Sequence, residues 1–210
     1  MLKLYATARS ANGRKVLAVA RELKLAAEVH VVDVYRGEGR RPEYLAINPS
    51  GKIPALVEGD FVLTESNAIL CYLSEAHGNC RLYSTEPKAR ARIAQWLHFE
   101  SAHWQPVLST LLAAVVGHRL FPDRVPAPAS AVSWDDERLK SLLVALEASV
   151  SGQPFVAGER LSLADFSLGG MTTYFRAGAF PFARYPSVAA WYGRLGGLDS
   201  WRATADPLWD

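Results

Sequence analysis

The feature that most constrains this chain is the point at which its strand-like segments stop. Short apolar segments typical of β-strands occur only in the first third of the 210 residues, and every later periodic segment has helical spacing. The strand-like segments are Leu2–Tyr5, Glu28–Val32, Ala55–Glu58 and Phe61–Leu63. This distribution predicts an α+β module followed by an all-helical one.

Helical segments alternate with these strands. Apolar residues recur at helical spacing over Asn12–Leu23, over a short piece around Glu43–Ala46, and over Thr64–Ala76. Gly59 and Asp60, between the last two strands, suit a tight hairpin turn. The order βαβαββα predicts a parallel strand pair extended by an antiparallel hairpin, with helices on both faces, which is the thioredoxin-like plan.

The second half of the chain predicts an all-α helical bundle. Residues 78–87 lack periodicity, so we expect an N-terminal domain at 1–77, a linker at 78–87 and a helical domain at 88–210. The expected helices cover 88–116 with a bend at Pro106, 134–150, a segment opened by a capping box at Ser162–Asp165, Ser187–Leu195, and the surroundings of Trp201. Within this pattern we expect Asp165 to be structural.

Composition excludes several classes of function. The 23 basic residues nearly balance 21 acidic ones and are dispersed, which argues against a nucleic-acid partner. No apolar run reaches the length of about 18 residues that spans a bilayer, so we expect no membrane partner. The start of the chain lacks the pattern of a secretory signal, and its two cysteines suit a reducing compartment, so we expect a cytoplasmic protein. No cluster of histidines and carboxylates has metal-ligand spacing, so we expect no metal.

Three loops of the first domain carry polar groups that a thioredoxin-like fold would bring to one edge of the sheet. Ser10 precedes the first helix, whose free amides and positive dipole end favour an anion such as a thiolate. A cis bond before Pro54 would turn the backbone of Ile53 outward to pair with an extended peptide. Glu65 and Ser66 open another helix. Each signal alone is explained equally well by a helix cap or an ordinary proline, but together they predict one site.

At these residues the chain resembles the glutathione S-transferase superfamily, in its bacterial-type theta-like, delta-like or nu-like classes. The resemblance is carried by NPSGKIPAL at 48–56, GDFVLTESNAILCYL at 59–73 and FVAGERLSLADF at 155–166. It implies that glutathione is the co-substrate. It also implies that Glu65 and Ser66 hold the γ-glutamyl end and that Ile53, preceding Pro54, pairs with the cysteinyl backbone. Lys52 is implied to bind the glycyl carboxylate. The charges are complementary, because Glu65 can pair with the ligand ammonium and Lys52 with a ligand carboxylate.

The resemblance leaves two candidates for the catalytic residue. In the theta-like and delta-like classes a serine donates to the glutathione sulfur, and Ser10 followed by Arg14 fits that pattern. In the nu-like class the loop pattern implies that Asn12, followed by Gly13 and Lys15, shares or carries the role. One donor is enough, because a hydrogen bond to a charged group contributes roughly 1.5 to 3 kcal/mol and about 1.36 kcal/mol equals one pKa unit. The loop has no cysteine, which argues against a mixed disulfide with a protein thiol.

We therefore expect an enzyme, a detoxifying glutathione transferase that conjugates glutathione to small, mostly hydrophobic electrophiles. The electrophile is expected between the domains, near His103, Trp104 and Phe121. The resemblance also implies a homodimer. Two alternatives stay open: a nu-like glutathione-dependent disulfide reductase or peroxidase, and a non-catalytic module that uses the fold for ligand binding or assembly.

Overall fold

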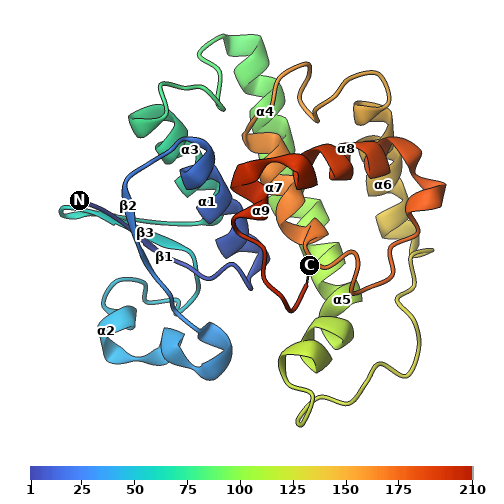
Figure 1. The fold of residues 1–210 in the computed structure, drawn as a ribbon, viewed down its shortest axis with the longest axis horizontal. Coiled ribbons are helices and arrows are strands. Elements are labelled where there is room, and N and C mark those ends of the chain that lie inside the picture. Colours follow the sequence, from blue (N-terminus) through green and yellow to red (C-terminus); the bar gives the residue numbers. More distant parts are fainter. Residues whose placement is uncertain (210) are drawn as a thin grey trace.

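A four-stranded mixed sheet forms one side of the molecule and helices form the rest (Figure 1). The structure is a computed structural model and describes residues 1–209. The strands are β1 (Leu2–Tyr5), β2 (Ala27–His30), β3 (Ala55–Glu58) and β4 (Phe61–Thr64), in the order β2-β1-β3-β4. β1 runs parallel to β2 and antiparallel to β3, and β3 pairs antiparallel with β4, as the sequence predicted.

Helices cover both faces of the sheet, because successive strand residues point to opposite sides. α1 (Ala11–Glu22) and α3 (Ser66–Tyr72) pack on the face that carries Leu4 and Leu56. The four-residue α2 (Pro42–Leu45) lies on the other side of the sheet (Figure 1). Its Tyr44 packs against Val32 and Ile53 in a small second core.

Two elements of this domain differ from the prediction. β2 ends at His30, two residues early, and Val32 lies in the small core with Tyr44 of α2 instead of in the strand. The helix expected from Thr64 begins only at Ser66, since Thr64 still pairs in β4.

The long helix predicted at 88–116 is present and extends four residues further. It consists of α4 (Pro87–Phe99), a π-helical stretch (Glu100–Trp104) and α5 (Gln105–Leu120). Pro106 lies in the first turn of α5, where its missing N–H is tolerated. The irregularity therefore falls on the π-helical turn just before the proline.

The remaining helices are α6 (Glu137–Val150), α7 (Leu163–Thr172), α8 (Pro186–Gly197) and α9 (Asp199–Arg202). Every residue of α7 is buried, and the predicted capping box at its start is present. Asp165 is completely buried and accepts hydrogen bonds from the Val156 and Ser162 amides and from Nε1 of Trp191, at 2.8 to 2.9 Å. Burial raises the pKa of Asp165. Its role is structural, because it joins the loop before α7 to α8.

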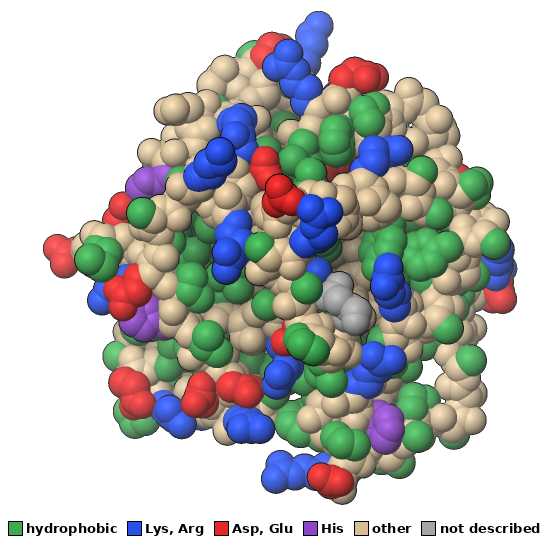
Figure 2. Space-filling view, in the orientation of Figure 1, with side chains coloured by type: hydrophobic (Ala, Val, Ile, Leu, Met, Phe, Trp, Pro, Cys, Tyr) green, Lys and Arg blue, Asp and Glu red, His purple; other side chains and the backbone are tan. Residues whose placement is uncertain are grey.

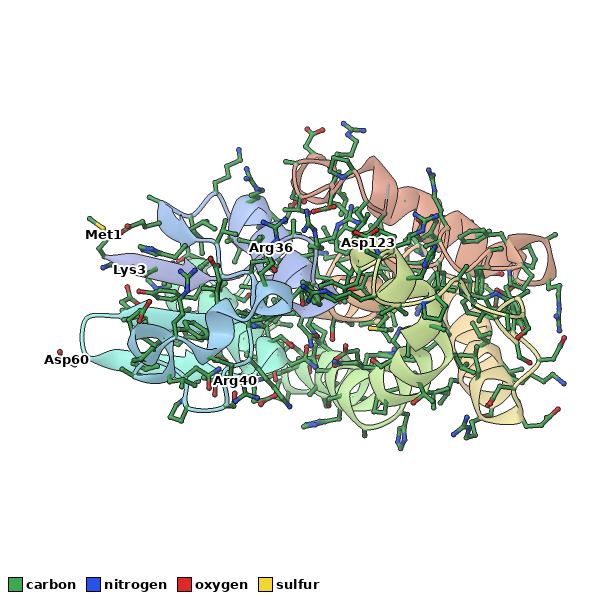
Figure 3. All side chains as sticks on the ribbon, turned by 90° about the horizontal axis from the view of Figure 1, so that it is seen from below. Met1, Lys3, Arg36, Arg40, Asp60 and Asp123 are labelled. Carbon is green, nitrogen blue, oxygen red and sulfur yellow. The ribbon has the colours of Figure 1, made fainter. Side chains whose placement is uncertain are left out.

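The two domains share one continuous hydrophobic core. α1 packs against α7 and α9, and a Cβ at Gly170 would lie 3.0 Å from the carbonyl oxygen of Ala11. Met1, Lys3 and Asp60 mark the end of the sheet away from the helical domain (Figure 3). The boundaries at 77 and 87 remain our proposal. Within residues 1–209 no helix has the length and apolarity to cross a bilayer.

Candidate functional site

Two adjoining clefts lie at the boundary between the domains, and Asn12 lines both. The first has a volume of about 510 Å³, and its walls come from the loop before β3, the start of α3, and the helix that includes α4 and the π-helical stretch. The second, of about 220 Å³, lies between the start of α1 and α5. Its apolar wall consists of Leu112, Ala113, Val116 and Met171.

The first cleft brings together all five residues predicted to bind glutathione, which are Lys52, Ile53, Pro54, Glu65 and Ser66. The Ile53–Pro54 peptide bond is cis, as the thioredoxin-like interpretation expected. The carbonyl oxygen of Lys52 accepts hydrogen bonds from the Tyr44 hydroxyl at 2.6 Å and from Nδ2 of Asn48 at 2.7 Å. These bonds hold the turn against α2.

Glu65 has an unusual backbone conformation. Its φ is +67°, a region that non-glycine residues seldom occupy and that costs of order 1 to 3 kcal/mol. Strained residues of this kind cluster at functional sites, where the surrounding structure holds them in place. The Glu65 side chain is exposed in the cleft, and next to it Oγ of Ser66 donates to Oδ1 of Asn12 at 3.3 Å.

Ser10 is the N-cap of α1 and can still act as a donor. Its Oγ accepts the Gly13 amide at 3.5 Å, which uses a lone pair and leaves the hydroxyl proton for another acceptor. Ser10 lines the second cleft. Because Oδ1 of Asn12 accepts from Ser66, the amide protons of Asn12 also remain as donors. The two candidate thiolate donors therefore lie at the junction of the clefts.

Lys15 and Arg14, which belong to the sequence patterns at this loop, are buried and line neither cleft. Nζ of Lys15 is buried 3.0 Å from Oε2 of Glu100 and 2.9 Å from Oδ1 of Asn67. Burial lowers the pKa of Lys15, and Glu100 opposes this effect. The guanidinium of Arg14 lies 4.5 Å from the centre of the Trp201 ring in the domain interface.

Asn67 and Glu100 are residues of the first cleft that sequence reasoning missed. Nδ2 of Asn67 donates to Oε2 of Glu100 at 2.9 Å, and Ser167 donates to Oδ1 of Asn67 at 2.8 Å. Oε1 of Glu100 is buried and has no hydrogen-bond partner within residues 1–209. The charge of this carboxylate is balanced by the buried ammonium of Lys15.

Of the three residues predicted at the electrophile site, only Phe121 lies by a cleft. Its ring centroid is 6.4 Å from that of Tyr35, in a groove also lined by Arg36 and Asp123 (Figure 3). Trp104 is a correction: it is completely buried, and its Nε1 donates to the Leu168 carbonyl. His103 is a second correction, because its ring is exposed beside Phe99 and lines neither of the two clefts described above.

Tyr35 and Tyr174 line the second cleft and were not predicted. The Tyr35 hydroxyl interacts with those of Tyr174 and Ser10, and burial raises the pKa of Tyr35, so it stays protonated at neutral pH. Neither tyrosine has a local signal in the sequence. Both become site residues only through the packing of the two domains.

Charged side chains outside the clefts are dispersed on the visible face (Figure 2). On the face seen in Figure 2, basic side chains are scattered among polar and hydrophobic ones. No group of three or more histidine, cysteine or acidic side chains suited to a metal ion occurs in the part of the chain that the structure describes.

Comparison with known proteins shows that the chain is similar to glutathione S-transferases in sequence and in structure. Family models described as glutathione S-transferase, N-terminal domain, and glutathione S-transferase, C-terminal domain, match residues 4–81 and 105–194. The chain is 32% identical to glutathione S-transferase F10 of Arabidopsis thaliana, over 96% of this chain and 95% of the relative. It is 33% identical to a probable glutathione S-transferase, GSTF2, of Oryza sativa subsp. japonica, over 92% and 91%. A solved glutathione S-transferase-I bound with lactoylglutathione superposes with a TM-score of 0.85 at 28% identity, covering 97% and 98%.

Proposed function

Because the chain belongs to the glutathione S-transferase family, we propose that its two clefts hold glutathione and an electrophile side by side. The chain is a glutathione transferase that uses glutathione as co-substrate. The observation that carries the proposed arrangement is the position of Asn12, which lines both clefts. A thiol bound in the first cleft near Asn12 would face a carbon held against the apolar wall of the second.

The first cleft fits the charges of glutathione. The ammonium of the γ-glutamyl end meets the exposed carboxylate of Glu65, and Ser66 binds the adjoining carboxylate. The ammonium of the exposed Lys52 forms an ion pair with the glycyl carboxylate. Between them the backbone of Ile53 pairs with the extended cysteinyl residue.

Ser10 and Asn12 then stabilise the thiolate. The hydroxyl of Ser10 and the amide of Asn12 are the donors, assisted by the positive end of α1. Such a hydrogen bond moves a thiol pKa from about 8.5 to around 7, which leaves much of the bound glutathione ionised at neutral pH. The thiolate attacks the electrophilic carbon, the new C–S bond forms, and the leaving group or the developing anion departs toward solvent.

Calorimetry of glutathione binding, together with turnover of an aryl halide, tests these roles. We expect Glu65→Ala to abolish binding, and Ser10→Ala to lower kcat/KM about 10- to 100-fold, which corresponds to the loss of one charge-assisted hydrogen bond. Ser10→Thr keeps both the cap and the hydroxyl and is the matched control. Loss of turnover in Asn12→Ala but not in Ser10→Ala would transfer the main role to Asn12. Absence of glutathione binding by the unmutated protein would overturn the proposal and favour a non-catalytic module.

The disulfide reductase or peroxidase alternative now rests on Asn12 alone. Gly13 is required sterically, because a Cβ there would lie 2.2 Å from the carbonyl oxygen of Thr7, and Lys15 is buried in an ion pair. Two of the three residues that favoured the alternative therefore have structural explanations. Reduction of a disulfide or a hydroperoxide faster than conjugation of the aryl halide would reinstate it.

We also propose an F-type class and a homodimer. The curated relatives described above carry an F designation rather than the theta-like, delta-like or nu-like classes that the sequence resembled. The homodimer and the cytoplasmic location remain predictions. Phe61 and Val62, each 45% exposed, point to opposite faces of the edge strand β4, so both faces of this edge carry an apolar side chain that a second copy would cover. Light scattering on the wild type and on Val62→Glu checks the dimer, since a charge at this contact would dissociate it.

A further inference from the structure

A tyrosine of the helical domain reaches across the domain interface to the loop that carries Ser10. The hydroxyl of Tyr174 accepts the backbone N–H of Ala11 at 3.0 Å and donates to the backbone carbonyl of Arg9 at 3.2 Å. Arg9 and Ala11 are the immediate neighbours of Ser10. One phenol therefore holds the main chain on both sides of the proposed thiolate donor.

The surroundings of Tyr174 suit this double role. The residue is only 6% exposed, and burial raises the pKa of Tyr174 far above its ordinary value. The phenol is therefore protonated at every pH at which the enzyme would work, and it can donate and accept at the same time. A serine or threonine at this place would be too short to span the interface.

The C-terminal segment holds the same loop from a second direction. Nε1 of Trp209 donates to the Arg9 carbonyl at 3.0 Å, and its ring packs edge-on against Tyr174 with centroids 4.8 Å apart. The Arg9 side chain lies 3.5 Å from Oδ2 of Asp206. The carbonyl of Arg9 thus accepts two donors from the helical domain, whereas the Ala11 amide depends on Tyr174.

These contacts also decide which groups face the sulfur. With the Ala11 amide bonded to Tyr174, the first-turn amide next to Ser10 is not available to a bound anion. The hydroxyl of Ser10 is left as the donor at this point of the helix end. Its hydrogen bond to a sulfur is sensitive to alignment, and small displacements of a catalytic group cost large factors in rate.

We propose that Tyr174 is a positioning residue of the reaction, whose hydroxyl fixes the Ser10 loop so that the Ser10 proton points at the glutathione sulfur. It acts on the sulfur through the loop, which it holds by its bonds to Arg9 and Ala11. The inference rests on the proposed role of Ser10 as the thiolate donor. It adds that the helical domain, through Tyr174, sets how strongly glutathione is ionised in the other domain.

Tyr174→Phe tests the proposal, since it keeps the ring against Trp209 and removes only the hydroxyl. We expect glutathione affinity to stay within about twofold, because Lys52 and Glu65 hold the peptide elsewhere. The apparent pKa of the bound thiol, measured from the ultraviolet absorbance of the thiolate, should rise by about half a unit to one unit. Turnover at pH 6.5 should fall about 3- to 10-fold and recover near pH 9, where the thiol ionises without help.

Two further variants make the result specific. Tyr185→Phe alters another buried tyrosine of the helical domain, packed on Phe180, and should leave the pH profile unchanged. Trp209→Phe removes one of the two donors to Arg9 and should shift the thiol pKa in the same direction by a smaller amount. If Tyr174→Phe folds poorly, Trp209→Phe still measures how the support of the Ser10 loop affects the thiol pKa.

A loss of turnover in Tyr174→Phe that is equal at every pH, or an unchanged thiol pKa, would overturn the proposal and leave Tyr174 a purely structural residue. That failure is distinguishable from failure of the proposed function. If Ser10→Ala also leaves the thiol pKa unchanged, the role of Ser10 is wrong. If Ser10→Ala raises it and Tyr174→Phe does not, only the role of Tyr174 is wrong.

Discussion

At the scale of single residues, Cys71 is a free thiol in the cleft proposed to bind glutathione. Cys71 is half-buried and lines the first cleft. Burial, with a smaller contribution from Glu75, raises the pKa of the Cys71 thiol to about 11. At pH 7 its thiolate fraction is therefore on the order of 10⁻⁴, and the thiolate is the reactive form.

We predict that Cys71→Ala retains the turnover of the wild type, and that the wild-type Cys71 stays unmodified after incubation with oxidised glutathione at pH 7. Mass spectrometry of the intact protein measures the modification, with Cys80→Ala as the background so that Cys71 is the remaining thiol. Formation of a stoichiometric mixed disulfide at Cys71 within minutes would contradict the prediction.

Residue-scale reasoning from the sequence located polar residues in loops better than aromatic residues on helices. Ser10, Glu65 and Ser66 stand at helix starts, where the local pattern fixes their position, and all three line clefts. Trp104 ends a π-helical stretch, which changes the phase of the helix relative to regular spacing. The sequence has no signal for that change of phase, and the tryptophan faces the core.

At the scale of elements, the start of α1 depends on a glycine. A Cβ at Gly13 would lie 2.2 Å from the carbonyl oxygen of Thr7 and 3.0 Å from its amide nitrogen, and backbone atoms cannot move aside cheaply. The absence of a side chain lets the loop before Ser10 fold back onto the helix.

We predict that Gly13→Ala lowers the free energy of unfolding by about 1 to 3 kcal/mol or more, as overpacking does, and that it lowers turnover by displacing Ser10. Gly193→Ala is the matched control, because a Cβ at Gly193 in α8 meets open space and should add about 0.5 to 1 kcal/mol of stability. Chemical denaturation measures both changes. Equal effects of the two substitutions would show that the Thr7 contact does not constrain the loop.

Element bounds were predictable where side-chain alternation and turn chemistry agree. β1 and β3 have the predicted bounds, and Gly59 with a φ of +60° makes the predicted turn between β3 and β4. β2 was displaced because Val31 and Val32 have strand propensity, but packing under α2 ends the strand sooner.

At the scale of the whole molecule, a buried ion pair joins the two domains. Lys15 comes from α1 and Glu100 from the helical domain, and their side chains are 0% and 1% exposed. Removing one partner of such a pair leaves a buried charge uncompensated, which typically costs about 3 to 5 kcal/mol.

We predict that Lys15→Met and Glu100→Gln each destabilise the protein by about that amount, and that the double variant is more stable than the sum of the two losses implies. Thermal and urea unfolding of the wild type, the two single variants and the double variant measure the four stabilities of this double-mutant cycle. Additive losses would show that the two charges do not interact. Because the pair is shielded from solvent, the coupling should change little between low and high salt.

The sequence predicted the two-domain architecture but not the contacts between the domains. Strand and helix periodicities indicate which face of an element is apolar, and this was enough to predict a parallel strand pair, an antiparallel hairpin and a helical second domain. The hydrogen bond between Ala11 and Tyr174 joins residues 163 positions apart, and no local sequence pattern at either residue predicts this contact. Such contacts follow only from the packed molecule.

The bond from Trp209 to Arg9 also has a consequence for the order in which the protein is made. The two residues are 200 positions apart, so a ribosome has finished the sheet and nearly all the helices before the indole exists. During synthesis the Ser10 loop therefore lacks one of its supports until Trp209 has been added and packed against it.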